Sequence, residues 1–126
     1  MSYIVYIPES VEVNEYTGIG EMEISADLNY FTKTAIISVF VNSDFKLVHK
    51  NDSSLIIPYE LTTSEPGVHG AVSNGGLVAT FEYNNTVAKT LTVRLKKWAS
   101  ELGTYLGNLT FTIDFDTGET RNLMEE

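Results

Sequence analysis

The sequence predicts an all-β fold, in which a single antiparallel β-sandwich of about eight strands spans residues 1–126. Apolar and polar residues alternate along most of the chain, and this period of two is typical of strands that bury one face. Turn-forming residues separate the alternating runs at the spacing expected of a sandwich or small barrel. The length of 126 residues, with 43% hydrophobic and 20% charged residues, suits one globular domain.

The first half of the chain contains several alternating segments. The first strand, over residues 2–7, ends at Pro8 because proline cannot donate to a strand ladder. Pro58 lies inside the last of these segments, where it predicts an edge strand or a bulge. The residues expected to face inward are Tyr3, Val5 and Ile7, then Met22, Ile24, Ala26 and Leu28, then Ile37, Val39, Val41, Phe45 and Leu47, then Leu55, Ile57, Tyr59 and Leu61.

The second half begins with residues 62–76, which are rich in turn formers and are predicted to form a mobile surface loop. Beyond it, the inward residues are Leu77, Ala79, Phe81 and Tyr83, then Leu91, Val93 and Leu95, then Leu109, Phe111, Ile113 and Phe115. Only residues 96–102 could form a helical turn, which Gly103 would end. Residues 116–119 are predicted to form a hairpin turn before a short strand over residues 120–123. The whole series predicts an immunoglobulin-like or jelly-roll sandwich.

The charge balance excludes several classes of partner. With 8 basic and 17 acidic residues, the net charge of −9 repels nucleic acids and anionic membranes. No apolar run approaches the roughly 18 residues of a membrane-spanning helix, and the N-terminal residues lack the basic region and cleavage site of a signal peptide. The absence of cysteine excludes disulfides and thiolate metal sites.

Three segments together carry a family resemblance: residues 4–11 (IVYIPESV), residues 37–39 (ISV) followed by 43–47 (SDFKL), and residues 103–113 (GTYLGNLTFTI). In this order they resemble the immunoglobulin-like or pilin-like β-sandwich modules of surface proteins from Gram-positive bacteria. The resemblance implies a structural or adhesive module without catalytic residues.

Within the last of these segments, Gly103 and Gly107 allow a tight entry or a close backbone approach, and Tyr105 can pack beside the first inward position. The chain departs from the family pattern in two ways: an export signal is not found, and the chain continues from Asp116 to Glu126. An immunoglobulin-like module of a bacteriophage particle, which lysis releases without a signal, would explain both departures.

Acidic residues suggest two kinds of site, and the pattern favours neither. Asp114, Asp116 and Glu119 could supply oxygen ligands to a cation, but their spacing does not complete a calcium loop, and a hairpin turn is the simpler interpretation. The pairs Glu9/Glu12 and Glu21/Glu23 could be imagined as catalytic carboxylates. Glu21 and Glu23, however, alternate with apolar residues, so they are expected on the solvated face of one strand.

No catalytic, cofactor or metal site is predicted, and the protein is expected not to be an enzyme. His49 and His69 lack the spacing of a catalytic triad or a metal site, so they are expected to be solvent-exposed loop residues. No nucleophile, base and orienting group occur together in the sequence.

Aromatic residues fall into two groups. Tyr3, Tyr59, Tyr83 and Tyr105 share the phase of inward residues, so they are expected to pack in the core with their hydroxyls at the rim. Residues at turns and element ends are free to contact a subunit or to stack on a glycan; they are Tyr16, Tyr30, Phe31 and Trp98.

The sequence therefore predicts a non-enzymatic structural protein that contacts neighbours through strand edges, termini and end loops, with residues 2–7 and 120–124 as the principal edge segments. The predicted contact residues are Tyr3, Val5, Tyr16, Tyr30, Phe31, Trp98 and Leu123. The missing export signal favours a bacteriophage virion component, such as a capsid decoration or minor structural protein in a homo-oligomer or on capsid or fibre proteins. The alternatives are a pilus-like adhesive module at the bacterial cell surface and a carbohydrate-binding module.

Overall fold

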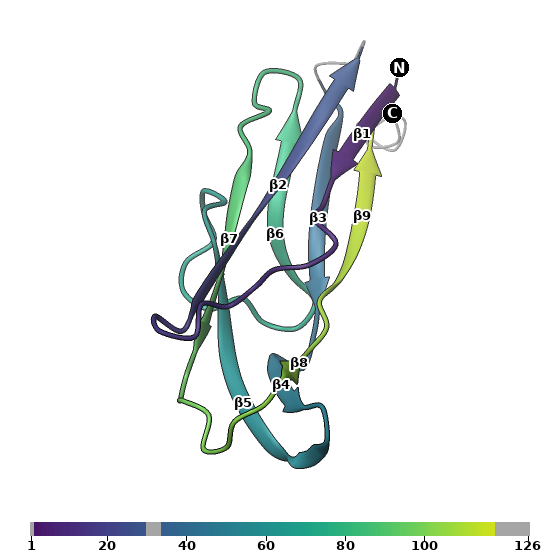
Figure 1. Ribbon diagram of the computed structural model, residues 1–126. Coiled ribbons are helices and arrows are strands. Elements are labelled where there is room, and N and C mark those ends of the chain that lie inside the picture. Colours follow the sequence, from purple (N-terminus) through teal and green to yellow (C-terminus); the bar gives the residue numbers. More distant parts are fainter. Residues whose placement is uncertain (1, 30–33, 118–126) are drawn as a thin grey trace.

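The computed structural model describes residues 2–29 and 34–117, and this part of the chain is all-β (Figure 1). Its strands are β1 (Ser2–Tyr6), β2 (Ile19–Asn29), β3 (Ile36–Asn42), β4 (Lys46–His49), β5 (Asp52–Thr63), β6 (Gly76–Glu82), β7 (Lys89–Leu95), β8 (Tyr105–Leu106) and β9 (Thr110–Asp116). None of the described residues belongs to a helix long and apolar enough to cross a membrane.

The strands form two antiparallel sheets in a sandwich-like arrangement. One sheet has six strands in the order β1-β2-β7-β5-β4-β8, and the other has three strands in the order β6-β3-β9. The predicted all-β antiparallel class is thereby confirmed, with nine strands in the described residues rather than about eight. The smaller sheet lies over the upper part of the larger one, while β4, β8 and one end of β5 extend below it (Figure 1).

The core lies between the two sheets. Ile37, Val39 and Val41 of β3 are fully buried, and the polar or larger residues between them are not. They pack with inward residues of the six-stranded sheet, among them Ile24 and Leu61. Burying each such side chain contributes roughly 1.5–3 kcal/mol, which makes this layer contact the main source of stability. The period-two pattern identified these residues correctly.

A bulge disturbs the pattern on β6. The pairing between β3 and β6 shifts after Val39, which lies opposite Ala79, while Phe40 lies opposite Leu77. Val78 and Ala79 are consequently both buried, although they are consecutive. Tyr83 was expected to face inward and is 53% exposed, because β6 ends one residue earlier in a turn.

Pro58 neither lies on an edge strand nor forms a bulge, since β5 pairs with both β4 and β7. The ladder with β7 begins only at Tyr59, opposite Leu95. The Pro58 carbonyl accepts a hydrogen bond from the Lys96 N–H (2.9 Å), but proline has no N–H to return. The ladder between β5 and β7 therefore ends at this residue.

The expected surface loop is present, but it is shorter than residues 62–76 and is packed against the core at several points. β5 continues to Thr63, and Val72 is buried in the core. The Val72 N–H donates to the Leu61 carbonyl and the Gly75 N–H to the Val41 carbonyl, both at 2.7 Å. The loop is thus fastened to both sheets.

A buried ion pair provides a further attachment for this loop. Glu65 is 6% exposed and Lys89 is 2% exposed, and Lys89 Nζ lies 3.4 Å from Glu65 Oε1. Lys89 Nζ also donates to the Thr80 carbonyl (2.9 Å) and lies 5.2 Å from the centre of the Phe81 ring. Glu65 Oε1 accepts hydrogen bonds from the Thr80 N–H and hydroxyl. Every charge in this cluster has a polar partner, which offsets the cost of its burial.

Substitution of Lys89 by methionine is expected to lower the free energy of unfolding by about 3–5 kcal/mol, because it leaves the Glu65 carboxylate buried without its counter-ion. The double variant Lys89→Met/Glu65→Gln, whose amide oxygen can still accept from Thr80, should recover most of the loss. Urea denaturation of both variants measures the difference. A double variant whose loss in free energy of unfolding equals the sum of the losses of the two single variants would contradict this assignment.

Candidate interaction surfaces

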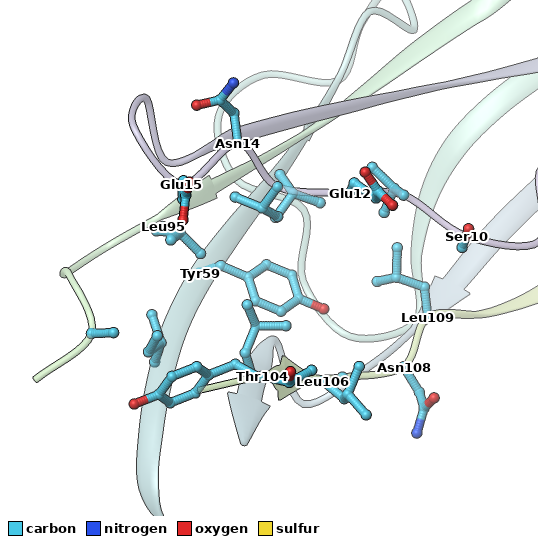
Figure 2. A pocket seen from close by; sticks show the side chains of 18 of the residues that line it. Ser10, Glu12, Asn14, Glu15, Tyr59, Leu95, Thr104, Leu106, Asn108 and Leu109 are labelled. Carbon is cyan, nitrogen blue, oxygen red and sulfur yellow. The ribbon is translucent and has the colours of Figure 1, made fainter. Parts of the chain in front are cut away.

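A groove of about 840 Å³ opens on the part of the six-stranded sheet that the smaller sheet leaves uncovered. Tyr59 of β5 lies at its floor, between two irregular segments of the chain (Figure 2). One wall comes from the connection between β1 and β2 and carries Ser10, Glu12, Asn14 and Glu15 (Figure 2). The other wall runs from residue 103 to residue 109.

The first wall depends on a turn at Asn14 and on the lack of a side chain at Gly20. Asn14 Oδ1 accepts hydrogen bonds from the Tyr16 N–H (2.8 Å) and the Thr17 N–H (3.1 Å). A Cβ atom at Gly20 would stand 2.5 Å from the Glu12 carbonyl oxygen. Glycine at this position therefore lets the connection lie directly on β2.

The second wall depends on His49, which was expected to be a solvent-exposed loop residue and is instead a half-buried residue at the end of β4. Its Nδ1 accepts from the Asn51 N–H (3.0 Å), so the other ring nitrogen carries the proton and donates to the Leu102 carbonyl (2.9 Å). The His49 ring fills the space that a Cβ at Gly103 would need. Nε2 and the ring face thus position this wall, while Nδ1 holds the connection between β4 and β5.

The segment before this wall, residues 96–102, contains no helical turn, so the expectation of one there was wrong. The segment is too short to be a stable helix without tertiary support. Instead, Gly103 adopts φ 140°, and Gly107 lies so close to the Lys46 carbonyl that a Cβ there would stand 2.5 Å from its oxygen. The predicted close backbone approach at Gly103 and Gly107 is confirmed.

Tyr59 links the floor of the groove to the second wall. It is 4% exposed, and its hydroxyl lies 3.1 Å from Ser43 Oγ, which donates in turn to the Asn108 carbonyl (2.7 Å). Burial raises the pKa of Tyr59, the charge of Asp44 adds to this, and the hydrogen bond with Ser43 opposes it. Of the tyrosines expected in the core, Tyr59 is buried and Tyr105 is half-buried.

The charged residues that line the groove are all acidic. Its lining includes four glutamates, Glu9, Glu12, Glu15 and Glu101, and no lysine or arginine. All four carboxylates are exposed at the rim, while the floor is apolar. The groove therefore favours a ligand that combines apolar groups with positive charge.

A second surface is formed by two sheet edges that lie side by side, β1 of the larger sheet and β9 of the smaller one (Figure 1). The rings of Tyr3 and Phe115 stack across this boundary with their centres 5.1 Å apart. Apolar side chains remain exposed beside it, including Ile4 at 52% and Ile113 at 42%. Tyr6 donates a hydrogen bond to Asp27 Oδ2 (3.0 Å), and this carboxylate raises the pKa of Tyr6.

The predicted contact residues are distributed over both surfaces, and their role stays a prediction. Tyr3, which was expected in the core, is exposed on β1, where Val5 is half-buried. Trp98 is exposed and lines the groove, and one part of its ring lies against Gly18; Tyr16 is exposed in the turn before β2 and does not line the groove. Tyr30, Phe31 and Leu123 lie outside the described residues, as does the segment 120–124.

The remaining candidate residues form no site within the described part of the chain. No group of three or more His, Asp or Glu side chains there is arranged to hold a metal ion. Asp114 is exposed on β9, and Glu119 lies outside the described residues. Glu21, Glu23 and His69 are exposed, as expected.

The chain is similar in structure to a protein from a chaperone–tip adhesin complex of CFA/I fimbriae biogenesis. The TM-score is 0.62 with 19% sequence identity, and the match covers 88% of this chain and 41% of that one. At this identity the similarity establishes the fold and nothing beyond it. No protein-family model matches the sequence, and no curated protein matches it.

Substitution of Gly20 by alanine is expected to lower the free energy of unfolding by about 1–3 kcal/mol, because the added methyl group must displace the Glu12 carbonyl. Hydrogen exchange of the Asn14 amide, which donates to the Ile19 carbonyl (2.9 Å), should also become faster. Glu23→Ala is the control, since this side chain is exposed on the outer face of the same strand, β2. Unchanged exchange in Gly20→Ala would show that this glycine does not position the wall.

Tyr59 is expected to make the fold sensitive to alkali. Since its pKa is raised in the folded chain, its contribution to stability is complete below the unfolded value of about 10 and is lost as the pH rises through the folded value. Tyr59→Phe should therefore lose less stability above pH ~10 than the wild type does. Urea denaturation across this range tests the difference, and Tyr16→Phe should behave as the wild type.

Proposed function

We propose that this chain is a non-enzymatic module of a bacterial surface assembly, of the pilus-like adhesive kind, and that it contacts protein neighbours through open strand edges. The observation that supports this most is the position of β1 and β9, which lie next to each other at the margins of two different sheets. We propose further that the chain acts as one module in an extracellular setting.

The edges offer a direct route to assembly. Within the described residues, no strand pairs with the outer side of β1 between Ile4 and Tyr6 or of β9 between Thr110 and Asp114. Such an edge presents a row of backbone donors and acceptors to an extended segment of a neighbour. The exposed side chains of Ile4 and Ile113 would add apolar contact to that pairing.

The comparison with solved structures favours the pilus-like alternative over the virion component that the sequence predicted. The similar chain belongs to a fimbrial chaperone–adhesin complex, which supports the pilus-like setting better than a bacteriophage particle. The proposed contacts are protein contacts in both settings, so the physical argument for the edges is the same.

The ionisable groups that are not at the surface support a non-enzymatic role. Both nitrogens of His49 position a backbone segment, and Glu65 and Lys89 attach a loop. Each of these groups makes contacts that stabilise the fold. A catalytic group, in contrast, needs an atom that is free to exchange a proton or to attack a substrate.

The proposal is tested by placing a charge at each of the two open edges, β9 and β1. Ile113→Lys should weaken self-association of the full chain by at least about tenfold, because an inward-pointing charge prevents strand addition. Ile4→Lys, at an exposed position of β1, should act in the same direction with little effect on folding. Light scattering over a concentration series gives the association constant, and urea denaturation verifies the fold.

Val87→Lys is the matched control, since Val87 is an exposed apolar residue on the connection between β6 and β7. It should associate like the wild type. A wild-type chain that stays monomeric at millimolar concentration would contradict edge pairing between copies. Equal loss of association in Val87→Lys would show that the added charge, and not its position at the edge, is responsible.

A further inference from the structure

We propose that the groove above Tyr59 binds an extended segment of a different protein, one that alternates apolar and small polar residues and carries lysine or arginine near its ends. This surface is separate from the edges of β1 and β9, and its ligand differs in chemistry from a second copy of the chain. The inference rests on the shape, the walls and the charge of the groove.

The floor of the groove provides the apolar contact. It is formed by side chains of three neighbouring strands, including Met22 of β2, Tyr59 of β5 and Leu95 of β7. The volume of about 840 Å³ is large enough for several side chains of a ligand. Side chains on one face of an extended peptide would enter it at every second position.

The first wall provides backbone groups that can pair with such a peptide. Residues 8–13 belong to no strand, and within the described residues they make no hydrogen bond to another backbone group. They lie against β2 because Gly20 lacks a side chain, so they are positioned before any ligand arrives. A preorganised segment of this kind pairs at a lower entropic cost than a loose loop would.

The rim determines the charge of the ligand. Glu9, Glu12 and Glu15 lie on one wall and Glu101 precedes the other, and no lysine or arginine lines the groove. Negative charge on both sides of an apolar floor favours basic residues on both sides of an apolar stretch. A neutral or acidic segment would leave these carboxylates without compensation.

The chain cannot supply this ligand from its own described residues. Residues 89–97 have the required pattern, with Leu91, Val93 and Leu95 alternating before Lys96 and Lys97. Most of that segment is β7, which is paired on both sides by β2 and β5. The inferred occupant is a segment of another protein, and its chemistry follows from the shape and charge of the groove.

Synthetic peptides of about six residues that alternate valine, leucine, isoleucine or phenylalanine with threonine are the probes. Each is made with a lysine at both ends or with a glutamate at both ends. Calorimetric titration of the full-length chain should show that the lysine-ended peptides bind at least about tenfold more tightly. This preference should decrease as salt is added, because the rim carboxylates are exposed to solvent.

The variant Glu9→Gln/Glu12→Gln/Glu15→Gln/Glu101→Gln should remove the preference, and its fold should be unaffected because all four side chains are exposed. Leu106→Ser, at an exposed position of the groove, should weaken both series of peptides and keep the preference. Ile4→Lys at the β1 edge should bind the peptides like the wild type, which separates this site from the edge contact.

Three results would overturn the inference. The first is that no lysine-ended peptide binds at millimolar concentration. The second is that the glutamate-ended peptides bind equally well. The third is that the quadruple glutamine variant retains the preference for lysine, which would place the recognition outside the acidic rim.

Discussion

The contact between β3 and the inner face of the six-stranded sheet is the interaction on which the rest of the structure depends. Ile37, Val39 and Val41 are fully buried in it, and nearly all the buried apolar residues that the structure describes belong to this shared core. Because the smaller sheet has only three strands, it covers part of the larger one. The uncovered part becomes the groove, so the same constraint that creates the core also creates the candidate binding surface.

Irregular segments, and not strands, complete the cover over the larger sheet. The connection before β2 and the segment before β9 are held in place by glycines at points of close approach and by side chains that bond to backbone, chiefly Asn14 and His49. These contacts join segments that are close in sequence at Asn14 and far apart at His49. They give the walls a defined position without closing the groove, which is what a preformed binding surface requires.

The sequence predicted the strands better than it predicted which strands lie next to each other. Alternation identified the buried residues of β3 and the solvated Glu21 and Glu23 of β2, because period two reports which face of a strand is dry. It carries no information on which edges meet, so the position of β1 beside β9 could not be predicted. The bulge at Val78 broke the period, and Glu65 gave no sign of burial in a stretch rich in glycine and proline.

The candidate site was predicted only in fragments. Gly103 and Gly107 indicated a close backbone approach, and the signal at Gly20 was the same residue type in a strand interior, where glycine often marks such an approach. The acidic rim could not be recognised as a whole, because Glu101 is far from Glu9, Glu12 and Glu15 in the sequence and joins them only through the topology.

The buried pair of Glu65 and Lys89 has a consequence for heating. The hydration of charged groups becomes less favourable as the temperature rises, so the penalty for keeping this pair away from water decreases. Apolar contacts elsewhere in the core gain no comparable advantage. The attachment of the loop between β5 and β6 thus becomes relatively stronger in warm conditions.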